Sequence, residues 1–139
     1  MSRSLVLFIY NLLLPVFFIV AFPAWLLKMW KRGGYGTGLM ERFGSFSIDA
    51  SEEPRDVIYI HAVSVGEVFI ALKLIKQWMQ AEPNMKVVLA ATTSTGHAVA
   101  RENALAGVRV IYSPLDFNMI VTEVLSRFQP RQIVLIEAE

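Results

Sequence analysis

Side chains that can do acid–base chemistry lie close together in the segment HAVSVGE, residues 61–67. Glu67 is a candidate general base, because a carboxylate can take a proton from a substrate hydroxyl. His61 can be a core histidine, a hydrogen-bond donor to a substrate or a metal ligand. A purely structural explanation also fits, since Ser64 and Glu67 have the spacing of a capping box at a helix start. The residues alone leave these alternatives open.

A second polar segment, TTSTG at residues 92–96, offers hydroxyl groups and backbone amides where a helix is expected to begin. Such a helix start can bind a phosphate or a sugar, or the hydroxyls can simply cap the helix. No G-x-x-x-x-G-K-[ST] pattern is present, which excludes a P-loop nucleotidase. Further along, Asp116 is predicted to cap a helix, and Glu137 and Glu139 are expected on the same side of a strand.

The elements that position these residues follow from the hydrophobic pattern. The sequence predicts strands at 57–62, 86–92, 108–112 and 132–138, and helices at 68–80, 96–106 and 117–128. This alternation is typical of an α/β domain with a parallel sheet and helices on both faces. Ligands bind such sheets at the carboxyl ends of the strands, and the polar segments all lie at those ends. The pattern therefore predicts a Rossmann-like domain over residues 57–139, with one polar site.

The amino-terminal segment has a different composition. From Leu5 to Leu27 it carries no charged residue, which fits a membrane anchor over residues 1–30. Lys28 and Lys31 follow it directly, so the positive-inside rule places the rest of the chain in the cytoplasm. A cleaved signal peptide and a buried core helix are the less favoured alternatives. Residues 31–56 are predicted to be a junction loop with one short helix around residues 39–43.

Bulk composition limits the function. The chain has 139 residues, a net charge of +1 and no cysteine. A nucleic-acid partner has no electrostatic support at that charge. Thiolate metal sites are excluded, and the two histidines, His61 and His97, are not at metal-ligand spacing, so no metal is expected.

An ordered series of segments is recognisable as a whole. After the apolar anchor come RFG at 42–44, HAVSVGE at 61–67, ATTSTG at 91–96, YSPLD at 112–116 and RFQPRQIVLIEAE at 127–139. The series resembles the amino-terminal half of 3-deoxy-D-manno-octulosonic acid (Kdo) transferases. That resemblance implies a membrane-associated, two-domain glycosyltransferase of the GT-B fold. It further implies transfer of Kdo from CMP-Kdo to the lipid A precursor (lipid IVA), at the cytoplasmic face of the bacterial inner membrane and without a metal or other cofactor.

The resemblance also assigns roles to individual residues. It implies that Glu67 is the base for the acceptor hydroxyl and that Glu137 and Glu139 belong to a second catalytic acidic motif, E-T-E in the family but EAE here. The expected acceptor-binding residues are His61, Ser64, Gly66, Thr93, Thr95, Gly96 and Arg42. The family's second, donor-binding domain is expected to follow residue 139, so we expect these 139 residues alone to be inactive. The alternative is a non-catalytic, membrane-anchored module that binds a lipid-linked sugar.

Overall fold

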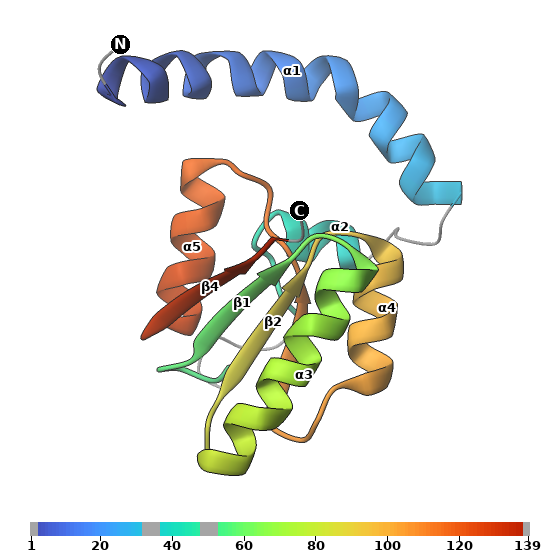
Figure 1. Cartoon of the computed structure of the whole chain (residues 1–139). Coiled ribbons are helices and arrows are strands. Elements are labelled where there is room, and N and C mark those ends of the chain that lie inside the picture. Colours follow the sequence, from blue (N-terminus) through green and yellow to red (C-terminus); the bar gives the residue numbers. More distant parts are fainter. Residues whose placement is uncertain (1–2, 32–36, 48–52, 138–139) are drawn as a thin grey trace. The chain divides into compact units, whose positions relative to one another are not determined.

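The computed structural model describes residues 3–31, 37–47 and 53–137 of the chain (Figure 1). They fall into two compact units, residues 1–35 and residues 36–139. The first unit contains helix α1 (Arg3–Lys31). The second contains α2 (Thr37–Arg42), β1 (Ile58–Ala62), α3 (Val65–Ala81), β2 (Val87–Ala91), α4 (Ser94–Asn103), β3 (Val108–Tyr112), α5 (Asn118–Phe128) and β4 (Gln132–Ile136).

Helix α1 is long and apolar enough to cross a membrane. Its apolar stretch, Arg3–Lys28, has 26 residues and a mean hydropathy of 2.6, and at 1.5 Å per residue it rises about 39 Å, more than the hydrocarbon thickness of a bilayer. Two prolines, Pro15 and Pro23, lie inside the helix, and the helix bends along its length (Figure 1). The length and composition match the anchor predicted from the sequence.

The second unit is built on a four-stranded sheet of order β3-β2-β1-β4. Every neighbouring pair is parallel, and the register aligns Ala62 with Ala91 and with Ile136. The chain moves outward from β1 to β3 and then returns to place β4 on the other side of β1. The strand order therefore reverses between β1 and β4, and α/β sheets of this kind bind ligands at such a switch point.

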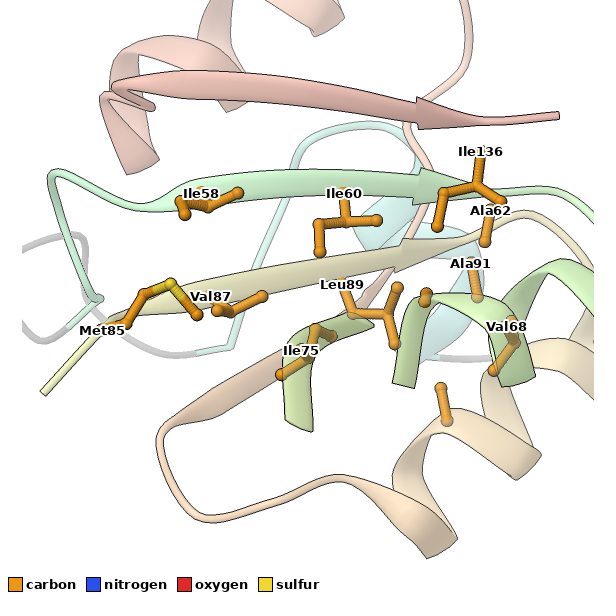
Figure 2. Packing of buried hydrophobic residues seen from close by; sticks show 12 residues of the cluster. Ile58, Ile60, Ala62, Val68, Ile75, Met85, Val87, Leu89, Ala91 and Ile136 are labelled. Atoms are coloured by element: carbon orange, nitrogen blue, oxygen red, sulfur yellow. The ribbon is translucent and has the colours of Figure 1, made fainter. Parts of the chain in front are cut away.

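Apolar residues cover both faces of the sheet. One face packs Ile60 and Leu89 against α3, through Val68 and Ile75 (Figure 2). The other face packs Tyr59, Val88 and Ile111 against α5, through Val124 and Phe128. Side chains alternate along each strand, so a strand between two helical layers must be apolar at nearly every position. The fold class predicted from the sequence is confirmed.

The helix boundaries depend on caps that the hydrophobic pattern does not show. Helix α3 begins at Val65 rather than 68, because Ser64 caps it. Helix α4 begins at Ser94 rather than 96, because Thr93 caps it. The predicted cap of α5 is wrong: Phe117 occupies the cap position and makes no side-chain capping hydrogen bond. Asp116 lies one residue too early for that role.

The short helix predicted in the junction is present as α2, and its end explains the RFG segment. Gly44 has a φ of +80°, a conformation that favours glycine. The Gly44 N–H donates to the Glu41 carbonyl at 2.9 Å and the Ser45 N–H to the Met40 carbonyl at 2.9 Å. These two bonds form a Schellman motif, which ends the helix and turns the chain.

Candidate functional site

A cleft of about 830 Å³ opens at the switch point of the sheet. Its apolar walls come from β1, β4 and α5, on the sheet face that α5 covers. Its polar side chains come from the carboxyl ends of the strands and the start of α3. The lining residues are Tyr59, His61, Val63, Glu67, Pro114, Asp116, Val121, Val124, Leu125, Ile133, Leu135, Ile136 and Glu137. Three predicted site residues, His61, Glu67 and Glu137, are therefore brought together.

Glu67 is held in place by the backbone that precedes its helix. Its Oε2 accepts hydrogen bonds from the N–H of Val63 at 2.6 Å and from the N–H of Ser64 at 3.3 Å. Its own N–H donates to Ser64 Oγ at 3.2 Å, which completes the predicted capping box. The side chain is buried, with 9% of its surface exposed, yet it lines the cleft. The Glu67 carboxylate thus caps α3 and lines the cleft at the same time.

His61 lies at the end of β1 and also lines the cleft. Its Nδ1 is 3.1 Å from the hydroxyl of Ser113. Burial lowers the pKa of His61 below its ordinary value, while the negative charge of Glu67 acts in the opposite direction. The larger effect is burial, so the neutral imidazole is favoured. A neutral histidine has one nitrogen that donates and one that accepts.

Two further groups have pKa values shifted by burial. Burial raises the pKa of Tyr59, whose side chain lies in the wall of the cleft. Burial also lowers the pKa of Arg42. The Arg42 guanidinium donates to the Thr92 carbonyl at 2.6 Å and lies 4.5 Å from the centre of the Tyr112 ring. With only 6% of its surface exposed, Arg42 fixes α2 against the strand ends, and the acceptor-binding role expected of it stays a prediction.

The threonine-rich segment forms the start of α4. Thr93 caps the helix, with its Oγ1 accepting from the Gly96 N–H at 3.1 Å. The Thr95 hydroxyl lies 3.5 Å from the same oxygen. None of these residues lines the cleft. The capping explanation is therefore confirmed, and sugar or phosphate binding by Thr93, Thr95 and Gly96 stays a prediction.

The remaining predicted positions are divided between the described and undescribed parts of the chain. Glu137 follows β4 and lines the cleft, whereas Glu139 lies outside the described residues. Ser64 and Gly66 lie at the start of α3, beside Glu67. Among the residues that the structure describes, no three histidine or acidic side chains gather in a way that could hold a metal ion.

Sequence reasoning missed Ser113 and placed Asp116 in the wrong role. Asp116 lines the cleft rather than capping α5. Ser113 is 4% exposed and contacts His61. The signal that could have found it is register: Ile111 and His61 both align with Ala90, so Ser113, two residues after Ile111, lies on the face that His61 occupies.

Comparison with known proteins decides the family. The protein-family model described as 3-deoxy-D-manno-octulosonic-acid transferase (kdotransferase) matches residues 37–139. The chain belongs to the Kdo transferase family. The match begins at α2 and includes every element of the second unit, so it contains the cleft and its polar side chains.

Individual Kdo transferases align with most of the chain. A 3-deoxy-D-manno-octulosonic acid transferase of Chlamydophila psittaci is 32% identical over 133 residues, 95% of this chain and 30% of the relative. That of Chlamydia pneumoniae is 29% identical over 131 residues, 94% of this chain and 30% of the relative. That of Haemophilus influenzae is 32% identical over 109 residues, which is 78% of this chain and 25% of the relative. The chain thus spans less than a third of the length of these relatives, and no solved structure matches it significantly.

Proposed function

We propose that this chain is the acceptor-binding, amino-terminal part of a glycosyltransferase that transfers Kdo from CMP-Kdo to a lipid A precursor. One observation carries the proposal: the family match extends over the whole sheet unit, and Glu67 lines the cleft at the switch point of that sheet. The cleft thus combines a carboxylate with a position where α/β sheets bind ligands. Kdo transfer is what the names of the relatives state.

In this proposal Glu67 is the general base. The carboxylate takes the proton of an acceptor hydroxyl, the hydroxyl oxygen bonds to the anomeric carbon of Kdo, and the bond from that carbon to CMP breaks. Hydrogen bonds from the Val63 and Ser64 N–H groups fix the orientation of the carboxylate. General-base assistance of this kind contributes about 10²–10⁴-fold to a rate. No metal or other cofactor is assigned to the reaction.

We further propose that the chain lies at the cytoplasmic face of the bacterial inner membrane, anchored by α1. The apolar length of the helix supports this, and so do Lys28 and Lys31 in its last turn. The acceptor is a lipid, so an anchor keeps the protein at the surface where its substrate lies. Lys28 and Lys31 are suited to meet the phosphates of an anionic lipid.

The active site of a GT-B enzyme lies between two domains. In this proposal the chain supplies only the acceptor-binding domain. We therefore infer that a polypeptide of these 139 residues alone binds a lipid A precursor without transferring Kdo. The relatives are more than three times as long as the part that aligns. A donor-binding domain is the part that the reaction still requires.

The experiment is a transfer assay. Membranes that contain the gene product as the cell makes it are incubated with CMP-Kdo and a lipid A precursor, and the lipid product is weighed by mass spectrometry. We expect a mass increase of one or more Kdo units, and no increase with the purified 139-residue chain. Lipid binding without Kdo addition by the cellular product would contradict the proposal and favour a non-catalytic lipid-sugar module.

A further inference from the structure

A hydrogen-bond network next to the cleft joins the side chains of Thr92, Ser113 and His61. The Thr92 hydroxyl lies 3.3 Å from the Ser113 hydroxyl, and the Ser113 hydroxyl lies 3.1 Å from Nδ1 of His61. The backbone continues the sheet pattern at these positions, because the Thr92 N–H donates to the Ala62 carbonyl at 3.1 Å and the Ser113 N–H to the Ala91 carbonyl at 2.9 Å. The positions of the hydroxyls are thus set by the register of three strands.

We propose that Ser113 is a positioning residue that accepts a hydrogen bond from the Thr92 hydroxyl, donates a hydrogen bond to Nδ1 of His61, and so holds the imidazole as the Nε2–H tautomer. The nitrogen left to a ligand in the cleft is then a donor. His61 would bind and orient a substrate oxygen, and it would not compete with Glu67 for the role of base. This inference deepens the proposed function and rests on it for the identity of that substrate.

The direction of the hydrogen bonds is inferred from the Thr92 hydroxyl, which donates to Ser113 Oγ. Each hydroxyl has a single proton, so if Ser113 accepts from Thr92 its own proton is available to Nδ1. Hydrogen bonds that run in one direction strengthen one another in a buried site, and Ser113 is only 4% exposed. The opposite direction would require Nδ1–H to donate to Ser113 and Ser113 to donate to Thr92.

The charge of Glu67 is compatible with the same tautomer. His61 and Glu67 both line the cleft, and the Glu67 charge acts on the imidazole. With Nδ1 accepting from the Ser113 hydroxyl, the proton of the neutral ring is on Nε2, and Nε2–H is the donor that His61 offers to the cleft in this proposal. Burial keeps the ring neutral, so only one nitrogen carries a proton. The hydrogen bond from Arg42 to the Thr92 carbonyl holds the Thr92 end of this network in place.

The test is nitrogen NMR of the full 139-residue chain, labelled with ¹⁵N-histidine and solubilised in detergent micelles. The chain has only two histidines, so His97→Phe identifies the His61 signals by difference. At neutral pH we expect a protonated, pyrrole-type Nε2 and an unprotonated, pyridine-type Nδ1. A protonated Nδ1 would overturn the proposal, and this measurement on the wild-type chain needs no substitution at Ser113.

Two variants then test the role of Ser113 itself. Ser113→Ala removes the donor and is expected to shift the tautomer equilibrium, whereas Ser113→Thr keeps a hydroxyl and should preserve the Nε2–H form. In the cellular product, Ser113→Ala should raise the acceptor KM roughly twofold to tenfold with less change in kcat, as loss of one positioned hydrogen bond does. An unchanged His61 spectrum in Ser113→Ala would refute the assignment. Absence of Kdo transfer by the wild type would refute only the proposed function.

Discussion

The imidazole of His97 stacks on the phenol ring of Tyr112, with ring centres 3.8 Å apart and planes inclined by 7°. The contact joins α4 to the end of β3, and the Arg42 guanidinium from α2 contacts the same Tyr112 ring. His97 is 7% exposed. Burial, with a smaller contribution from nearby arginines, lowers the pKa of His97 to about 4 from an ordinary 6.5. The imidazole in the stack is therefore neutral near pH 7.

Stability is therefore expected to fall in acid. Between about pH 6.5 and pH 4 the unfolded chain binds a proton at His97 that the folded chain does not, so the free energy of unfolding falls as pH falls, by up to about 1.4 kcal/mol per pH unit. Above pH 6.5 this residue contributes no pH dependence. Urea unfolding of the detergent-solubilised chain across that range measures the slope.

His97→Phe is the control for that slope. Phenylalanine can keep a stacked ring on Tyr112 but has no proton to gain. The variant should lose part of the pH dependence, the remainder including His61, whose pKa burial also lowers. An identical slope in His97→Phe and in the wild type would show that the acid sensitivity arises elsewhere.

A buried ion cluster fastens the segment before β1 to the rest of the unit. Glu53, with 1% of its side chain exposed, is bonded by Arg109 at 3.0 Å and 3.1 Å and lies 3.7 Å from Arg127. Glu53→Gln leaves buried positive charge without its counter-charge and should lower the free energy of unfolding by about 3 kcal/mol.

The matched control is the exposed ion pair of Glu82 and Arg131. These side chains are 57% and 40% exposed and lie 3.2 Å apart, so Glu82→Gln should change the free energy of unfolding by less than about 1 kcal/mol. Equal effects in Glu53→Gln and Glu82→Gln, measured by urea unfolding, would argue against the buried cluster as a source of stability.

Two glycines in predicted acceptor-binding segments should respond differently to alanine. A Cβ at Gly96 would lie 2.8 Å from Thr93 Oγ1, the oxygen that caps α4. Gly96→Ala should therefore cost about 1–3 kcal/mol of stability. A Cβ at Gly66 would meet nothing closer than Ser64 Oγ at 3.9 Å. Gly66→Ala should stabilise the helix by about 0.5–1 kcal/mol.

The Gly66 variant also separates structure from function. If an acceptor must approach the start of α3 closely, Gly66→Ala should lower lipid binding while raising the thermal midpoint. Unchanged binding of a lipid A precursor by the stabilised variant would remove Gly66 from the acceptor site.

The strands were predictable because each is marked in the sequence by a run of apolar residues that includes β-branched ones. Val108–Tyr112 is a strand at the predicted bounds, since a run of β-branched residues favours the extended backbone and Gly107 precedes it with a φ of +89°. Helix starts were predicted less well. Ser64 and Thr93 begin their helices before the apolar pattern becomes regular, so the pattern alone placed both starts too late.

The candidate site was predictable only in part. The strand ends identified His61, Glu67 and Glu137, because parallel strands bring those ends to one edge. The contact of His61 with Ser113 was not predicted, since it requires the register across β2. The burial of Arg42 depends on where the turn at Gly44 directs the chain, which no local pattern shows.

The role of Glu67 as a base is tested by the rate of Kdo transfer by Glu67→Gln in the cellular product, relative to the wild type. Glutamine can keep the capping hydrogen bonds from Val63 and Ser64, because its side-chain oxygen still accepts, but it cannot take a proton. If Glu67 is the base, the thermal midpoint should be unchanged and kcat should be lower by about 10²–10⁴-fold. A kcat within a few-fold of the wild type would contradict this role and leave Glu67 as a helix cap alone.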